Sequence, residues 1–172
     1  MRSSVFALFA GIAFLSAGLL GLMPAALIPP PADAPPLHFN LLHGDLLGLF
    51  PVNALHSAAH LAIGFWGIVA WHGTVSPKGY ARALTILYAI LAVIGLIPGL
   101  NTLFGLVPIY GHDVWLHGAT AAISGYFWWH AARAEPERRA DKDVDRRQQT
   151  VPVPRDRRDG HDRRLPFNSE ID

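Results

Sequence analysis

The sequence contains no cysteine, and it has almost no charge over most of its length. Between Ser3 and Pro77 there is no Lys or Arg, and the acidic residues there are Asp33 and Asp45. The lack of cysteine excludes disulfides, thiolate nucleophiles and cysteine-ligated metal sites. The sequence also shows no serine-based triad, no phosphate-binding glycine loop and no pair of intramembrane carboxylates. Because no motif names a reaction, we expect a protein that is not an enzyme.

The charged residues gather at the C-terminal end of the chain. Residues 133–172 hold 11 of the 14 basic residues and 10 of the 13 acidic residues. Alternating opposite charges with little apolar periodicity predict a disordered cytoplasmic tail over 133–172. The interleaved acids weaken any attraction of this tail to anionic lipid. We expect residues 1–132 to form a single domain inside the membrane.

Long apolar runs fill that domain, and four of them approach the length of about 20 residues that a helix needs to cross a bilayer. We predict spanning helices at about residues 5–23, 54–71, 81–97 and 114–130. A soluble bundle needs a polar face on every helix, whereas the third run, ARALTILYAILAVIGLI, is polar only at Arg82, Thr85 and Tyr88. The first run is longer than the core of a secretory signal, usually ~7–15 residues, so we expect it to be retained.

The few basic residues outside the tail predict the orientation. Arg2 precedes the first span, and Lys78 and Arg82 lie between the second and third. The other two loops, 24–53 and 98–113, contain no Lys or Arg. Because positive residues favour the cytoplasmic side, we predict a multi-pass cell-membrane protein with both termini in the cytoplasm.

An internal repeat indicates how the spans are organised. Residues 46–64, LLGLFPVNALHSAAHLAIG, return in looser form at 103–125, LFGLVPIYGHDVWLHGATAAISG. The matched residues include Pro51 with Pro108 and His56 with His117. Because each repeat unit contains two spans, both halves have the same orientation. The expected fold is an all-α integral membrane bundle of four transmembrane helices, made of two parallel helical-hairpin repeats.

Polar residues flank the repeated prolines and predict local structure there. Asp45 and Thr102 precede the two copies and are residue types that cap helix starts. We therefore predict one-turn interfacial helices over 46–50 and 103–107. On the same grounds, Asn53 and Asp113 are predicted N-caps of the second and fourth spans.

Histidine is the one chemistry-bearing residue type that the chain has in quantity, with nine copies. His56 and His60 are four residues apart and share a helix face, and His117 holds the matching place in the second copy. With Asp113 or His112 as a further ligand, these imidazoles suit zinc or copper. A pair from opposite helices can instead hold a haem. The alternatives are hydrogen bonds that tie the proline turns to the helices, or a proton-sensing role.

The repeated segments GLFPVNALHSAAHLAIG (48–64) and GLIPGLNTLFGLVPIYGHDVWLHGATA (95–121) resemble bacterial membrane proteins grouped as domain of unknown function 4383. The resemblance covers about residues 5–130. It implies a four-helix integral membrane protein and brings no assigned activity.

Taken together, these features predict a non-enzymatic structural or accessory subunit of the bacterial inner membrane. We expect it to lie in the lipid bilayer and to associate with itself or with a membrane-protein partner, without nucleic acid and without a cofactor. The first alternative is a metal- or haem-binding redox protein that uses His56, His60 and His117. The second is a small transporter, although the third span lacks the buried acid that ion-coupled transporters usually keep near the midplane.

Overall fold

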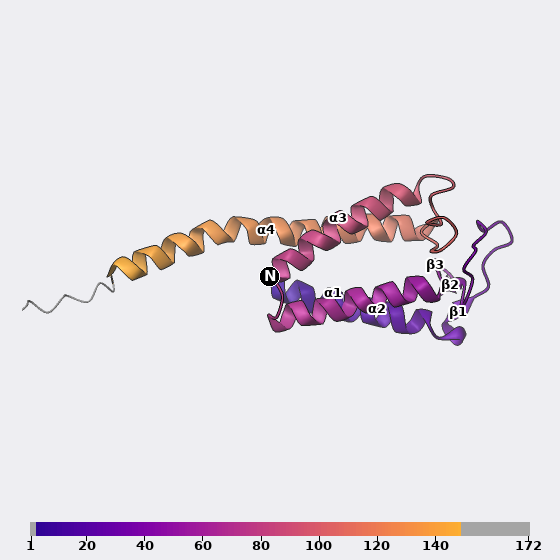
Figure 1. Cartoon of the computed structure of the whole chain (residues 1–172), viewed down its shortest axis with the longest axis horizontal. Helices are drawn as coiled ribbons and strands as arrows, with labels where there is room; N and C mark the ends of the chain where they lie inside the picture. The colour runs from indigo at the N-terminus through magenta and orange to yellow at the C-terminus, as the bar shows by residue number, and fades with distance from the viewer. Residues whose placement is uncertain (1–2, 149–172) are drawn as a thin grey trace, which may run out of the picture. The chain divides into compact units, whose positions relative to one another are not determined.

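Four α-helices make up most of the described chain, residues 3–148 of a computed structural model (Figure 1). They are α1 (Ser3–Gly21), α2 (Ala54–His72), α3 (Pro77–Gly95) and α4 (His112–Gln148). The burial of side chains is described for residues 3–133. The helices α1, α2 and α3 are each long and apolar enough to cross a membrane. They agree with the first three predicted spans to within a few residues, and the fourth predicted span falls inside α4.

The last helix continues past the predicted end of its span. Residues 133–148 were expected to belong to a disordered tail, whereas α4 extends to Gln148. This stretch, RAEPERRADKDVDRRQ, is rich in Arg and also contains Ala and Glu, which have high helix propensity even without an apolar face. Helix α4 therefore overlaps the start of the predicted tail. Residues 149–172, to which the same prediction applied, lie outside the described residues.

A small antiparallel sheet occupies part of the loop between α1 and α2. After a 3₁₀ turn, η1 (Pro24–Ala26), the strands follow in the order β1 (Leu27–Ile28), β2 (Gly44–Leu46) and β3 (Phe50–Val52). Leu27 pairs with Leu46, and Leu46 pairs in turn with Phe50. The chain is therefore mostly helical rather than all-α, and the predicted one-turn helix over 46–50 is wrong.

Turn geometry explains why neither copy of the repeat forms the predicted short helix. Leu47 and Gly48 adopt left-handed backbone angles, with φ of 54° and 73°, and close the β2–β3 hairpin. The matching Phe104 and Gly105 are also left-handed, with φ of 61° and 80°. Right-handed helix cannot continue through such residues. The hydroxyl oxygen of Thr102 accepts the N–H of Gly105 at 3.0 Å, so Thr102 caps a turn rather than the start of a helix.

The helices pack as two pairs, α1 with α2 and α3 with α4 (Figure 1). Glycines allow the first pair to approach closely, as small residues do between membrane helices. A Cβ atom added at Gly67 would lie 2.8 Å from the Cα of Gly11. In the second pair, the hydroxyl group of Thr85 donates to that of Ser124 at 3.2 Å.

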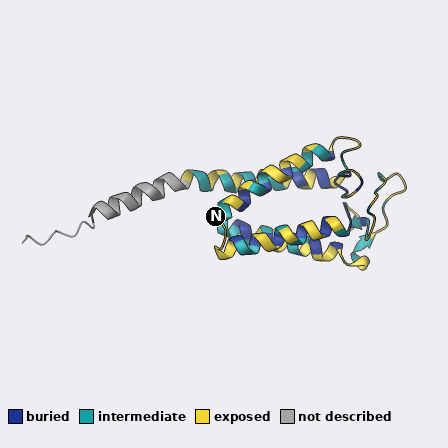
Figure 2. Ribbon diagram, viewed as in Figure 1, coloured by how far each residue is buried: buried dark blue, intermediate teal, exposed yellow. Residues whose placement is uncertain are grey.

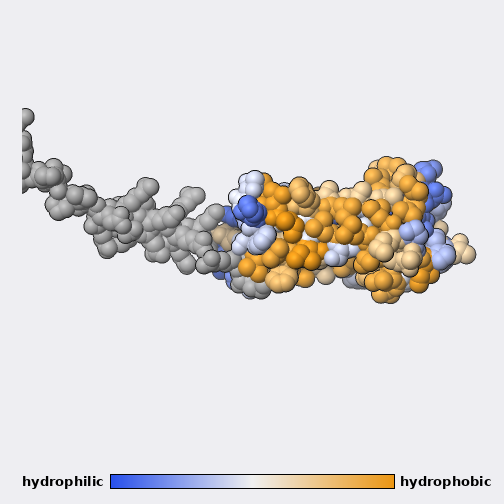
Figure 3. Space-filling model, turned by 90° about the horizontal axis from the view of Figure 1, so that it is seen from below, coloured by the Kyte–Doolittle hydropathy of each residue, from blue (hydrophilic) through white to orange (hydrophobic). Residues whose placement is uncertain are grey.

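Buried residues lie between the helices, and the outward faces are exposed and apolar (Figures 2 and 3). The buried core consists of Phe6, Ala7, Ala70, Tyr80, Ala81, Leu84 and Tyr88. In Figure 3 an apolar belt covers the helices and hydrophilic residues lie at its two ends, which is the pattern of a membrane protein. The loops before α2 and α4 lie at the same end of the bundle (Figure 1). The first turns of these two helices, which carry the repeated histidines, therefore meet.

Candidate metal centre

Asn53 brings the start of α2 together with both long loops. Its side-chain oxygen accepts the N–H of His56 at 2.9 Å, so the predicted N-cap is confirmed. Its amide nitrogen donates to the carbonyl oxygens of Phe39, at 2.9 Å, and Leu106, at 2.7 Å. Asn53 is fully buried. One side chain thus fixes the position of His56 relative to residues on both loops.

Asp113 does not cap α4, contrary to the prediction. The helix begins one residue earlier, at His112, so Asp113 lies within the first turn, where its side chain is buried. Asp113 and His117 are four residues apart and share one face of the helix. The Oδ2 atom of Asp113 lies 3.2 Å from Nε2 of His117 and 3.9 Å from Nε2 of His56.

These three side chains form a compact set of metal-ligand atoms. One such atom from each of His56, Asp113 and His117 lies within 4.8 Å of the other two, and all three residues are buried. In a tetrahedral zinc site with bonds of about 2.0–2.1 Å, neighbouring ligand atoms are roughly 3.4 Å apart. The separations of 3.2 and 3.9 Å lie on either side of that value. Small side-chain movements therefore suffice to enclose an ion.

Several polar atoms of this set have no hydrogen-bond partner. They are Nδ1 of His56, Oδ2 of Asp113, and both ring nitrogens of His117. The backbone carbonyls of Pro51 and Pro108 interact with the His56 ring, one from each copy of the repeat. Buried polar atoms without partners are costly and uncommon in folded proteins. Their concentration at one point indicates a place for a ligand.

Two of the other predicted ligands lie outside this set. His60 is buried one turn farther along α2, with its ring centroid 4.5 Å from that of His56. Its ring packs against Phe14 of α1 at 5.4 Å. His112 is exposed at the start of α4. The structure therefore groups His56, His117 and Asp113, with His60 in ring contact with His56 but outside the set of three, and His112 exposed.

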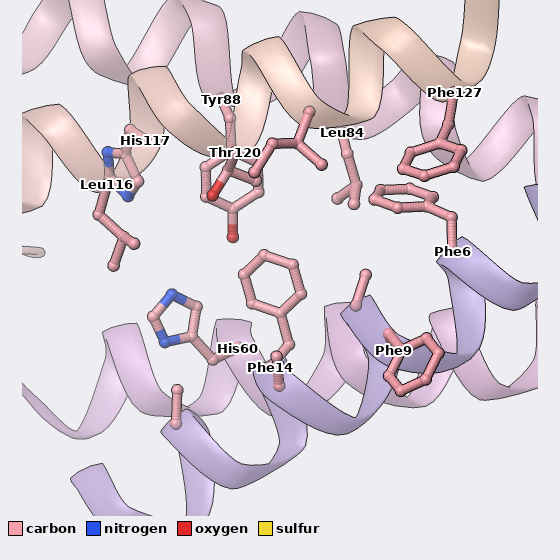
Figure 4. Close-up of a pocket in the computed structure, with 14 residues that line it drawn as sticks. Phe6, Phe9, Phe14, His60, Leu84, Tyr88, Leu116, His117, Thr120 and Phe127 are labelled. Atoms are coloured by element: carbon pink, nitrogen blue, oxygen red, sulfur yellow. The ribbon is translucent and has the colours of Figure 1, made fainter. Parts of the chain in front are cut away.

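An apolar cavity of about 590 Å³ begins beside the cluster and extends between α1 and α4 (Figure 4). Its polar end is formed by His60, His117, Tyr88 and Thr120, and its walls are mostly aromatic and aliphatic. A transporter would be expected to have a polar passage toward the membrane midplane. The apolar lining of this cavity does not favour that alternative.

A second, more exposed histidine contact links the two loops. Nε2 of His43 lies 3.4 Å from the hydroxyl oxygen of Tyr110. Desolvation lowers the pKa of His43 and raises the pKa of Tyr110. Both shifts favour the neutral forms, which can hydrogen-bond to each other without a buried charge.

The family model described as "Domain of unknown function (DUF4383)" matches residues 4–130. The chain belongs to this family. The match includes α1, α2, α3 and all three residues of the cluster, so the resemblance predicted from the repeated segments is confirmed. No curated protein and no solved structure matches the chain. The DUF4383 family is defined without a known function, so a function has to be inferred from the geometry of this site.

Proposed function

We propose that this DUF4383 protein is an integral membrane protein that binds a divalent transition metal through His56, Asp113 and His117. The observation that carries the proposal is the meeting of three buried ligand residues from α2 and α4, in which Oδ2 of Asp113 and Nε2 of His117 face each other without a hydrogen-bond partner. Two imidazoles and one carboxylate are a common ligand set for Zn²⁺, and they also suit iron or copper. Zn²⁺ serves as the reference ion for the tests below.

The geometry supports a bare ion better than a haem. The carboxylate oxygen of Asp113 lies 3.2 Å from one imidazole and 3.9 Å from the other, so it offers a third protein ligand, whereas a haem iron held by two imidazoles has no free position for one. Three protein ligands leave one position of a tetrahedral ion open to water or another small ligand. The proposed centre therefore holds its ion with an exchangeable fourth ligand.

The competing hypothesis is that the histidines only tie the proline turns to the helices. Asn53, and not a histidine, donates the two side-chain hydrogen bonds that join the start of α2 to the loops. His56 interacts with the carbonyls of Pro51 and Pro108. This interaction does not involve Asp113 or His117, whose Oδ2 and Nε2 atoms lie 3.2 Å apart without forming a hydrogen bond. A bound ion accounts for all three side chains, because it would engage an atom on each.

The proposed role is that of an ion linking the two halves of the chain. His56 belongs to the second helix and the other two ligands belong to the fourth, so the ion would join the two helix pairs. With both termini in the cytoplasm, as the basic residues predict, the centre would lie near the outer face of the membrane. Such a centre suits an accessory subunit that associates with itself or with another membrane protein.

The test is metal binding by the purified full-length protein. Chelator-treated protein is titrated with Zn²⁺, and in parallel with Co²⁺, whose visible absorbance reports tetrahedral coordination. We expect one ion per chain. Because loss of an outer-shell partner alone typically lowers metal affinity about 10–100-fold, His117→Asn and Asp113→Asn should each weaken binding at least that much.

His112→Asn is the matched control, because it removes an imidazole next to the cluster that is exposed and not part of it. This variant should bind the ion like the original protein. A preparation that takes up no metal, or a His117→Asn variant that binds as tightly as His112→Asn, would contradict the proposal and leave the structural role of the histidines as the better account.

A further inference from the structure

The apolar cavity beside the cluster has polar groups gathered at one end. His60 from α2 and Tyr88 from α3 both line that end, together with His117 from α4. His60 is 7% exposed, and its Nδ1 atom has no hydrogen-bond partner. In Figure 4 the His60 ring and the Tyr88 hydroxyl are directed into the space between the helix pairs. Three helices thus contribute hydrogen-bonding groups to the same end of the cavity.

The rest of the cavity is a long apolar channel. Its walls beyond the polar end are formed by Phe6, Phe9, Ala13, Phe14, Leu84, Ile123 and Phe127, among others. The lining residues of α1 run from Phe6 to Ala17, which is roughly 16 Å of helix at about 1.5 Å per residue. The volume of about 590 Å³ falls in the range of ligand pockets, about 300–1,000 Å³. This shape suits a hydrocarbon chain lying parallel to the helices.

The cavity is open toward the apolar surface of the bundle. Phe9 is 61% exposed and Ile123 is 54% exposed, although both line it. An amphiphile dissolved in the bilayer can therefore enter from the side without crossing water. Its headgroup would then meet His60 and Tyr88, while its chain stays in an apolar environment.

The chemistry of the polar end selects the headgroup. None of the described residues that line the cavity is Lys, Arg, Asp or Glu. In the metal-free protein an ionised headgroup would be buried there without a countercharge, which is costly, and an anionic one would also lie near the Asp113 carboxyl beside His117. A hydroxyl or carbonyl oxygen can instead bond to the Tyr88 hydroxyl and an imidazole nitrogen.

We infer that the cavity binds a single-chain neutral amphiphile, with its hydroxyl or carbonyl headgroup held by His60 and Tyr88 and its chain along α1. This inference does not rest on the proposed metal centre, because neither His60 nor Tyr88 belongs to the ligand set.

The test uses the full-length protein in phosphatidylcholine nanodiscs with a photoactivatable hexadecanol that carries a diazirine in its chain. Labelling is measured on the intact protein and its position by mass spectrometry of peptides. We expect saturable labelling on α1 and α4. Unlabelled hexadecanol and 2-octadecanone should compete, and their relative strength distinguishes a hydroxyl from a carbonyl ligand. Hexadecanoic acid and hexadecane should compete at least about 10-fold less well.

Variants separate the headgroup contact from the channel. Tyr88→Phe removes only a hydroxyl group and His60→Phe replaces the imidazole, and each should lower hexadecanol affinity by about 3–10-fold, as expected for one hydrogen bond. Ala13→Phe fills the channel and should abolish labelling. Ser16→Phe is the matched control, since Ser16 is exposed on the same helix and lies outside the cavity.

Equal competition by hexadecane and hexadecanol, with no effect of Tyr88→Phe, would mean that ordinary lipid chains fill the channel and would overturn the inference. Preferential competition by hexadecanoic acid would overturn it as well. Labelling is also measured after treatment with chelator. Unchanged labelling there, together with failed metal uptake, would contradict the metal centre while leaving this site intact.

Discussion

Replacing Asn53 should destabilise the protein strongly, because this one side chain makes three hydrogen bonds. Asn53→Ala removes the N-cap of α2 and two hydrogen bonds to loop carbonyls, at 2.9 and 2.7 Å. Loss of a cap typically costs about 1 kcal/mol, and each hydrogen bond contributes about 0.5–1.5 kcal/mol. The free energy of unfolding should therefore fall by about 2–4 kcal/mol. Asn53→Ser retains a capping oxygen and loses only the two loop contacts. Its free energy of unfolding should therefore fall by about 1–3 kcal/mol.

The assay is unfolding of the detergent-solubilised protein by SDS, followed by tryptophan fluorescence. Asn40→Ala provides the control, because Asn40 is exposed on the same loop. The Zn²⁺ affinity of each variant is measured in parallel, since Asn53 positions the N–H of His56. If Asn53→Ala costs no more than Asn40→Ala, the idea that this side chain joins the two loops is refuted.

Two further predictions concern helix packing and pH. Gly67→Ala places a methyl group 2.8 Å from the Cα of Gly11, and such overpacking should cost about 1–3 kcal/mol in the same SDS assay. Gly118→Ala meets no atom within 4 Å and should be neutral or stabilising, so equal losses in the two variants would contradict close glycine packing. Burial lowers the pKa of His43 below 6.5, so protons bind the unfolded chain more readily and stability should fall as the pH drops through that value. His43→Gln should show a shallower loss of thermal stability than the original protein between about pH 7 and 5, and identical pH profiles would refute this contribution.

The long apolar helices were predictable because their cause is local. Runs of apolar residues at 5–23, 54–71 and 81–97 satisfy the length that a bilayer requires, and α1, α2 and α3 lie close to these ranges. The cap at Asn53 was predictable for the same reason, because it depends on a few neighbouring residues. The loops were less predictable, since Leu47 and Phe104 adopt left-handed angles that leucine and phenylalanine rarely adopt.

The candidate centre was predicted only in part. His56 and His117 stood out because the repeat carries both, and Asp113 was named as a further ligand. His60 was expected to join them; its ring contacts both His56 and Phe14, but it is not one of the three grouped ligands. Tyr88, which lines the polar end of the cavity, gave no sequence signal, because one tyrosine in an apolar span resembles any core residue.

By itself, the sequence determined the apolar helices, the family and the pairing of Pro51–His56 with Pro108–His117, because composition, spacing and repetition are properties of neighbouring residues. Only the tertiary structure decided which polar groups meet. Asp113 lies inside the first turn of α4 rather than at its cap, and its carboxylate oxygen lies 3.9 Å from the His56 ring and 3.2 Å from the His117 ring. The shape of the cavity likewise depends on the packing of four helices, and contacts between distant segments cannot be read from any one of them.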